Sequence, residues 1–403
     1  MNKIYTVRGE QFVNQKGEPV RLKGINFACF DPKKNHTYGI LPEKEWETFA
    51  SYGCNVVRLG VWWSHLEPEP GQINETYIDE IERIVESFAE HGIATFLDMH
   101  QDLYAKKFND GAPDWATFTD GAEHKRCPLW YISYYMDEAV QNAIQAFWDN
   151  RPAEDGVGLM DHFSSCWKAL AKRFKNNPWM IGYDMYNEPE QGKEAREIGR
   201  RLIQAFAEWI SRLENRPVSW QEAFDIFYDE NRFAPYLVRI TPNVLKEIEE
   251  SVIALNDRFD IEVLTPFYEK VGTSIRQEDE TGLLMLCNGN FTNMGTPSSV
   301  QPLKIHGKRD PYQCFSYHGY DLVCDTNIQH LYSQERAEYI MLNHIGMARR
   351  YGMPLLIGEW GAFRDNDPAA ATKTEAMSSF LAKRGISYTF WVWKPDKGPL
   401  PLR

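Results

Sequence analysis

The chain has 403 residues and a formal net charge of −13, with 43% hydrophobic and 14% aromatic residues. This apolar content is enough for a large core, and an acidic balance without a basic block argues against nucleic acid or anionic lipid as partners. No stretch approaches the roughly 18 apolar residues of a membrane span, and the N-terminus has no apolar segment of signal-peptide length. We therefore expect a cytoplasmic protein.

The cysteines are odd in number and scattered, and no two of them form a C-x-x-C pair. This pattern favours reduced, mostly buried thiols over a disulfide framework or a zinc site. The sequence therefore predicts neither a metal nor a cofactor. The cysteines are Cys29, Cys54, Cys127, Cys166, Cys287, Cys314 and Cys324.

The N-terminal segment alternates short β-type stretches with turns and predicts a hairpin over residues 4–19. After it, short apolar or β-rich segments alternate with segments of helical periodicity, among them the predicted helices 42–53, 73–92 and 158–174. Eight segments are predicted strands: 21–27, 55–61, 93–100, 180–186, 283–288, 313–318, 354–360 and 387–393. This order predicts a (β/α)8 TIM barrel, because helical crossovers make neighbouring strands parallel.

Two departures from a plain barrel follow from the chain length. A (β/α)8 barrel needs about 250 residues, so we place the largest surplus in a mostly helical insertion over 191–260, after the fourth strand. Since that insertion leaves the C-terminal end of a strand, we expect it to form a cap on the catalytic face of a single domain, 1–403. Only ten residues follow 387–393, so the eighth helix is expected to be missing.

Polar residues interrupt the apolar segments near the C-terminal ends of the predicted strands, where barrel enzymes place their active sites. The fourth and seventh strands each end in a glutamate, and glycoside hydrolysis requires such a pair of acids. Aromatic rings at the same rim suit the apolar faces of sugars. The residues are Arg58, His100, Asp102, Asn187, Glu188, His318, Tyr320, Glu359 and Trp391.

Within this list, one ordered set resembles the signature of glycoside hydrolase family 5: Arg58, His100, Asn187-Glu188-Pro189, His318-x-Tyr320, Glu359 and Trp391. The segments LDMHQD, APDWA and LIGEWGAF are most similar to the endoglycoceramidase and glucosylceramidase branch. The resemblance implies a retaining double displacement with Glu359 as nucleophile and Glu188 as general acid, then base. It also implies that Asn187 holds the sugar 2-hydroxyl and that Tyr320 orients Glu359.

Elementary electrostatics agrees with these two roles. Arg58 close to Glu359 should favour its ionised form, whereas a like charge and aromatic surroundings should raise the pKa of Glu188. We expect the two carboxyl groups to lie about 5 to 5.5 Å apart, the retaining distance. His100 and His318 either contact substrate, as the resemblance implies, or are hydrogen-bonded rim residues.

Three further residues come from the resemblance. Asp102 is similar to the acid with which endoglycoceramidases hold hydroxyls of the sugar next to the ceramide. Lys33 and Trp130 lie where those enzymes use a lysine and a tryptophan in the glycone site.

The expected substrates are small glycosides or glycolipids with an apolar aglycone, because the insertion could narrow the site to a pocket. An endo-β-1,4-glucanase that acts on oligosaccharides or polysaccharides is the alternative within the family. The β-rich second domain of endoglycoceramidases is not expected here, and the oligomeric state is left open.

Two other functions are less consistent with the sequence. His100-x-Asp102 with the distant His318 resembles the ligand set of non-haem iron oxygenases, but their usual jelly roll is opposed by the strand and helix alternation. A non-catalytic sugar-binding barrel is opposed by the acid pair Glu188 and Glu359, which binding alone does not require.

Overall fold

The computed structural model describes residues 2–28, 43–364 and 367–393. Eight parallel strands form a closed barrel in chain order, so the predicted (β/α)8 fold is confirmed. Each observed strand lies within one of the eight predicted segments or overlaps it. The strands are β3 (Lys23–Phe27), β4 (Val56–Trp62), β5 (Ala94–His100), β6 (Met180–Asp184), β7 (Leu283–Leu286), β10 (Gln313–His318), β11 (Leu355–Glu359) and β12 (Ser387–Phe390).

Apart from the half-buried Lys23 at the start of β3, the barrel strands consist of buried residues. Both β4 and β5 consist entirely of buried residues, as expected for parallel strands covered on both faces. The predicted hairpin is formed by β1 (Tyr5–Arg8) and β2 (Gln11–Asn14). Phe12 of this hairpin packs into one apolar cluster with strand residues such as Val56 and Phe96, and it thereby closes the N-terminal end of the barrel.

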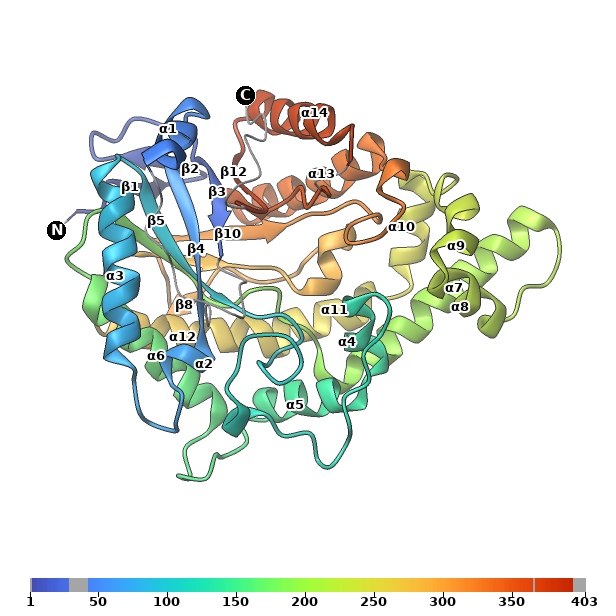
Figure 1. Ribbon diagram of the computed structural model, residues 1–403, viewed down its shortest axis with the longest axis horizontal. Coiled ribbons are helices and arrows are strands. Elements are labelled where there is room, and N and C mark those ends of the chain that lie inside the picture. The colour runs from blue at the N-terminus through green and yellow to red at the C-terminus, as the bar shows by residue number, and fades with distance from the viewer. Residues whose placement is uncertain (1, 29–42, 365–366, 394–403) are drawn as a thin grey trace.

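Helices cover the outside of the barrel (Figure 1). In α3 the buried residues Ile78, Ile81, Val85 and Phe88 recur every three or four positions, and Asn74 caps the first turn by accepting a hydrogen bond from the backbone of Tyr77. None of the helices in the described ranges has the length and apolar character to cross a membrane. The helices that cover the barrel are α1 (Glu43–Ser51), α3 (Glu75–Glu90), α6 (Leu159–Phe174), α12 (Thr265–Arg276), α13 (Gln334–Tyr351) and α14 (Ala370–Lys383).

The loops after β4 and β5 contain three further helices, α2 (Trp63–Leu66), α4 (Ser133–Met136) and α5 (Glu138–Trp148). Between β7 and β10 the chain forms the short 3-10 helix η6 (Asn290–Met294) and a small hairpin, β8 (Lys304–Ile305) with β9 (Lys308–Arg309), instead of an α-helix. The predicted absence of an eighth helix concerns residues 394–403, which lie outside the described residues.

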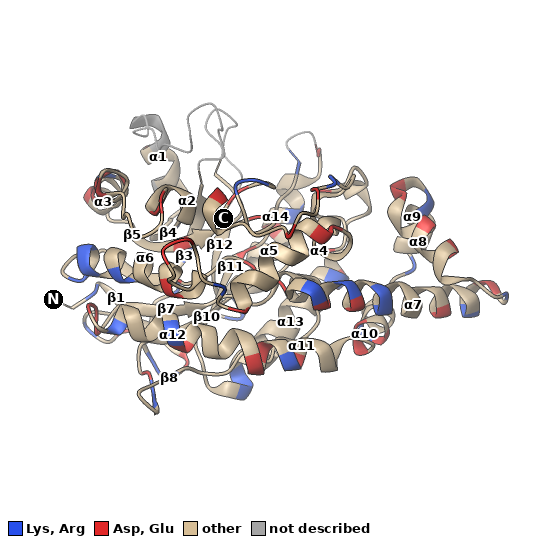
Figure 2. Ribbon diagram, turned by 90° about the horizontal axis from the view of Figure 1, so that it is seen from below, with Lys and Arg blue, Asp and Glu red and all other residues tan. Residues whose placement is uncertain are grey.

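The insertion after β6 is helical, as the sequence predicts, and it extends to one side of the barrel (Figure 1). Its members are η4 (Gly192–Glu194), α7 (Ala195–Glu214), α8 (Trp220–Tyr228), α9 (Glu230–Leu237), α10 (Pro242–Glu250) and α11 (Ile253–Phe259). Charged residues alternate with uncharged ones along α7 (Figure 2), whose apolar face packs on α8 and α10 to form a second core. In this insertion α10 and α11 are separated by Ser251 and Val252.

Candidate active site

Arg58 holds together a buried polar layer inside the barrel, just below its C-terminal rim. Its Nε lies 2.8 Å from Asp184, one Nη lies 2.8 Å from Asp98, and the other lies 2.5 Å from Glu359. Burial alone would lower the pKa of Arg58, but these three carboxylates outweigh it and raise that pKa well above its usual value. The guanidinium is therefore a permanent buried cation directly under the candidate acids.

Glu188 and Glu359 face each other at the rim. Glu359 is the last residue of β11, and Glu188 follows β6 with a left-handed backbone (φ +40°), which is a strained conformation for a residue with a side chain. Gln101 fixes this turn, since its Nε2 donates to the backbone carbonyls of Asn187 and Glu188. One carboxyl oxygen of each glutamate and one nitrogen of His318 all lie within 4.8 Å of one another.

His318 bridges the two carboxyl groups from below. Its Nδ1 lies 2.7 Å from Oε1 of Glu188 and 3.5 Å from Oε2 of Glu359. The side chain is fully buried, and burial holds its pKa well below the usual range for histidine. His318 and Arg58 are not among the residues that line the cavity described below, so their positions suit holding the carboxyls better than touching substrate.

The two glutamates accept different sets of hydrogen bonds. Glu359 accepts from Arg58 at 2.5 Å and from the hydroxyl of Tyr320 at 2.8 Å, whereas Glu188 accepts from Nδ2 of Asn290 at 2.8 Å. Only Glu359 thus has a charged donor among these contacts.

Burial raises the pKa of both carboxyls. Arg58 favours the ionised form of Glu359, as expected from the sequence, but burial outweighs the lowering effects of His318 and Arg58, so the pKa of Glu359 is raised overall. The pKa of Glu188 is raised as expected, but burial rather than the neighbouring carboxylate is the chief cause.

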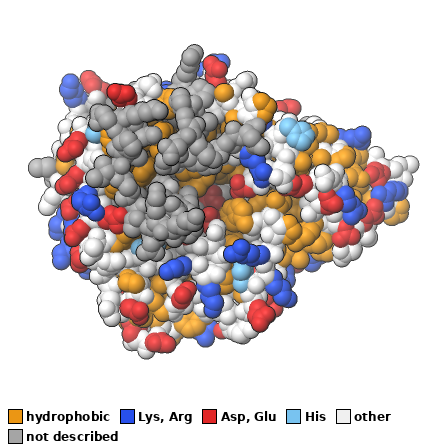
Figure 3. Space-filling model, in the orientation of Figure 1, with side chains coloured by type: hydrophobic (Ala, Val, Ile, Leu, Met, Phe, Trp, Pro, Cys, Tyr) orange, Lys and Arg blue, Asp and Glu red, His pale blue; other side chains and the backbone are white. Residues whose placement is uncertain are grey.

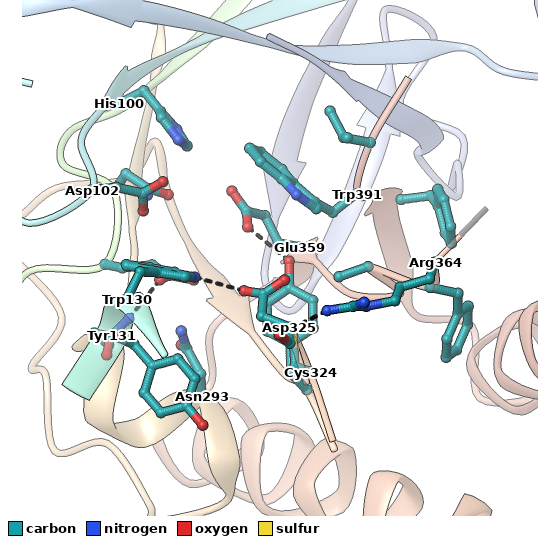
Figure 4. A pocket seen from close by; sticks show the side chains of 18 of the residues that line it. His100, Asp102, Trp130, Tyr131, Asn293, Cys324, Asp325, Glu359, Arg364 and Trp391 are labelled. Atoms are coloured by element: carbon teal, nitrogen blue, oxygen red, sulfur yellow. Dashed lines mark hydrogen bonds between the residues drawn. The ribbon is translucent and has the colours of Figure 1, made fainter. Parts of the chain in front are cut away.

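A cavity of about 480 Å³ opens above the two carboxyls. Figure 4 shows His100, Asp102, Trp130 and Tyr131 along one side of this cavity, with Glu359 and Trp391 beside them. The ring of Trp391 stacks on His100 with a centroid distance of 5.3 Å and an angle of 12°, and Nε1 of Trp130 donates to Asp325 at 2.9 Å. Of the residues predicted from the sequence, the cavity is lined by His100, Asp102, Trp130, Asn187, Glu188, Tyr320, Glu359 and Trp391. Lys33 lies outside the described residues.

Asp102 and His100, which line the cavity, each contact a further aspartate. The backbone of Asp102 donates to Oδ1 of Asp110 at 2.8 Å, and Nδ1 of His100 lies 2.7 Å from Asp98. Burial and the nearby Asp110 raise the pKa of Asp102 well above its usual range, and burial lowers the pKa of His100.

Three groups of side chains in the described ranges have spacings that could hold a metal ion. They are Asp98, His100 and Glu359; His100, Asp102 and Asp110; and Glu188, His318 and Glu359. The set considered from the sequence, His100 with Asp102 and His318, is divided between the second and third groups. The geometry therefore does not assemble the histidine-rich ligand set of a non-haem iron site.

A second cavity, of about 360 Å³, adjoins the first and is lined mostly by apolar side chains. Tyr131, Met294 and Leu322 line both cavities. The helices of the insertion contribute to this second cavity, whereas no described residue of 191–260 lines the first. The insertion, expected as a cap on the catalytic face, lines the second cavity and packs around its own core beside the barrel.

Four polar residues of the site were assigned no role from the sequence. Asp98 and Asp184 pair with Arg58, while Asn26 accepts from Arg58 at 3.0 Å and Asn290 donates to Glu188. The sequence does contain a signal for Asp98 and Asp184, because an acid within a strand buried on both faces requires a partner. Asp98 also precedes His100 by two residues, so the two side chains lie on the same face of the strand.

Comparison with known proteins identifies the family. Residues 13–397 match the sequence profile described as cellulase (glycosyl hydrolase family 5). An endoglycoceramidase of Hydra vulgaris is 35% identical over 169 residues, which cover 36% of this chain and 32% of that protein. A glucosylceramidase of Cryptococcus neoformans is 24% identical over 265 residues, or 51% of this chain and 34% of that protein. These matches span about a third of the length of the relatives.

Solved structures agree on the fold. Endo-glycoceramidase II from Rhodococcus sp., solved as a ganglioside GM3 complex, superposes with a TM-score of 0.72 at 21% identity and covers 98% of this chain and 79% of that one. An endogalactoceramidase gives a TM-score of 0.68 at 24% identity, with 98% and 75% covered. Since the family profile matches nearly the whole chain, the protein belongs to glycosyl hydrolase family 5.

Proposed function

We propose that the protein is a retaining β-glycosidase that hydrolyses glycosides with an apolar aglycone. The observation that carries this proposal is the pair Glu188 and Glu359, with one oxygen of each within 4.8 Å of the other and both contacting His318. Retaining enzymes hold their carboxyl groups about 5 to 5.5 Å apart, whereas inverting enzymes leave about 6.5 to 9.5 Å for a water molecule. The short separation supports direct attack by one carboxylate.

Glu359 is the proposed nucleophile, because Arg58 and Tyr320 both donate to its carboxylate. Its oxygen attacks the anomeric carbon as the glycosidic C–O bond breaks, and Glu188 gives its proton to the leaving oxygen, which departs as the aglycone alcohol. Glu188, now ionised, takes a proton from water, whose oxygen attacks the anomeric carbon and releases Glu359. Two inversions at one carbon leave its configuration unchanged.

The remaining rim residues fit the sugar. We infer that Asn187 contacts the 2-hydroxyl: its Oδ1 accepts from Arg58 at 2.8 Å and its Nδ2 donates to the carbonyl of Gln101 at 3.0 Å, which fixes the amide at the cavity wall. His100, Asp102 and Trp130 are proposed to bind sugar hydroxyls and faces. Arg58 and His318 are proposed as positioning residues that hold the carboxyls.

The apolar second cavity supports the aglycone class. A glycoside whose sugar occupies the polar cavity can extend its aglycone past Met294 and Leu322 into the apolar one. Removal of hydrocarbon from water contributes roughly 25 cal/mol per Å². Relatives named endoglycoceramidase and glucosylceramidase are consistent with this substrate class.

The test is hydrolysis of hexadecyl β-glucoside, glucosylceramide and cellohexaose by purified protein, with proton NMR of the first sugar released. We expect the β-anomer first and a preference for the two lipid-like substrates. An α-anomer as the first product would contradict the retaining mechanism, and a preference for cellohexaose would favour the endo-glucanase alternative.

A further inference from the structure

Glu190 is a buried acid to which the proposed reaction assigns no role. It follows the proposed general acid Glu188 by two residues, is 3% exposed, and is not among the residues that line the two cavities. Acids are rarely buried to this extent unless they are paired. Because Glu190 does not line the cavities, its effect on the reaction has to pass through the segment that carries Glu188.

The turn after β6, residues 187–192, follows an irregular backbone path. Glu188 has a φ of +40° and Gly192 a φ of +38°. At Glu188 this conformation is strained, and such strain persists only where the surrounding structure holds the residue in place. At Gly192 a Cβ would lie 2.8 Å from Oε1 of Gln145, so the chain there passes directly against α5. The direction of the Glu188 carboxyl therefore depends on the contacts that hold this turn.

Glu190 supplies three of those contacts. Its Oε1 accepts a hydrogen bond from the backbone nitrogen of Gln191 at 2.7 Å, and its Oε2 accepts from the hydroxyl of Tyr135 at 3.3 Å. Its backbone carbonyl accepts from Nε1 of Trp148 at 2.8 Å. Tyr135 belongs to α4 and Trp148 is the last residue of α5, so these bonds connect the turn to two helices of the loop after β5.

The acceptor oxygens of Glu190 are what these contacts require. Burial raises its pKa to about 7, so both protonation states are present at neutral pH, and each of them can accept hydrogen bonds. A glutamine at this position keeps an acceptor oxygen. An alanine leaves the backbone nitrogen of Gln191 and the hydroxyl of Tyr135 without the acceptor that they have in the wild type.

Tyr135 reaches Glu190 from the wall of the second cavity, which it helps to line. A Cβ at Gly199 of α7 would lie 3.1 Å from Cβ of Tyr135, so the insertion packs closely on this residue. Figure 3 shows hydrophobic side chains gathered between the barrel and the insertion helices. A phenylalanine in place of Tyr135 keeps the apolar wall and removes only the hydroxyl that contacts Glu190.

We propose that Glu190 is a positioning residue for the general acid, because it holds the turn after β6 against α4 and α5 and so keeps the Glu188 carboxyl directed at the leaving oxygen. This inference rests on the proposed function. General acid catalysis contributes roughly 10²- to 10⁴-fold, and a displacement of about 1 Å in a reacting group can cost about a hundredfold. Release of the turn should therefore slow substrates whose leaving group needs a proton and spare those whose leaving group does not.

The experiment measures kcat/KM for phenyl β-glucoside, whose leaving group needs a proton, and for dinitrophenyl β-glucoside, whose leaving group departs as a stable anion. We expect Glu190→Ala to lower kcat/KM for the phenyl substrate roughly tenfold to a hundredfold more than for the dinitrophenyl substrate. Tyr135→Phe should give a smaller difference of about threefold to tenfold, the effect of one hydrogen bond. Glu190→Gln should keep most of the wild-type activity on both substrates.

Glu249 and Tyr339 form the matched control pair. Glu249 is 4% exposed and its Oε2 accepts from the hydroxyl of Tyr339 at 3.2 Å, but the two residues lie on α10 and α13 instead of on the turn after β6. Glu249→Ala and Tyr339→Phe should therefore change kcat/KM for the two substrates alike. A melting curve by circular dichroism checks that each variant is folded.

Equal losses on both substrates for Glu190→Ala, or no loss at all, would overturn the role of Glu190, while cleavage of the two substrates by wild type still supports the proposed function. If Glu190→Ala does not fold, equal losses or no loss for Tyr135→Phe would overturn the role in the same way. If wild type cleaves neither β-glucoside, the proposed function itself fails.

Discussion

Nη1 of Arg58 lies 2.5 Å from Oε1 of Glu359, so the buried guanidinium of the barrel directly contacts one carboxyl of the catalytic pair. The same side chain also pairs with Asp98 and Asp184. Arg58 therefore connects the stability of the barrel interior to the charge of the proposed nucleophile. A change at this position should affect both properties.

Replacement of Arg58 by Met should destabilise the fold by about 3 to 5 kcal/mol, because it leaves Asp98 and Asp184 buried without their cation. Chemical denaturation followed by circular dichroism measures this loss. Arg173→Met is the control, since Arg173 pairs with carboxylates at the surface and should contribute about 1 kcal/mol or less. Equal destabilisation by the two substitutions would show that the buried network contributes little.

Tyr320→Phe should lower kcat roughly tenfold to a hundredfold, since a hydrogen bond to a charged group contributes about 1.5 to 3 kcal/mol. The hydroxyl of Tyr320 donates to Oε2 of Glu359 at 2.8 Å. Steady-state kinetics with an aryl β-glucoside measures the change. Tyr236→Phe, which removes a hydroxyl bonded to Glu214 on the insertion, should leave kcat as in wild type. An unchanged kcat in Tyr320→Phe would remove Tyr320 from the catalytic site.

The barrel and the acid pair could be predicted from the sequence because each has a local signal. Strands buried on both faces appear as continuous apolar segments, and polar residues such as Glu188 and Glu359 interrupt those segments at one end. Parallel strands align these ends, so residues distant in sequence are expected to meet.

The second cavity could not be predicted in the same way. It depends on how α7, α8 and α10 pack, and on the contact of Glu249 with Gly295, two residues whose neighbourhood no local pattern reveals. The position of the insertion beside the barrel likewise follows from side-chain packing. The balance of burial against the charge of Arg58 at Glu359 also requires the three-dimensional structure.

The pH dependence of kcat/KM should be bell-shaped, with both limbs above the usual glutamate pKa of about 4.3. Activity requires Glu359 ionised and Glu188 protonated. Burial raises both pKa values, so activity is lost on the acidic side as Glu359 gains its proton and on the alkaline side as Glu188 loses its proton. In Glu188→Gln, assayed with a dinitrophenyl glucoside that needs no acid, the alkaline limb should disappear. An unchanged alkaline limb would assign it to another group.

Asn290→Ala should move the alkaline limb to higher pH, by on the order of 1 pH unit. Nδ2 of Asn290 donates to Oε2 of Glu188 at 2.8 Å, and this hydrogen bond favours the ionised carboxylate and lowers its pKa. When the donor is removed, Glu188 keeps its proton to higher pH, so the general acid remains active there. A kcat/KM profile between about pH 4 and pH 9 tests the shift. Asn327→Ala, at a surface asparagine bonded to Glu230, should leave the limb in place. A shift of the Asn290→Ala limb to lower pH would mean that the amide stabilises the protonated form of Glu188 instead.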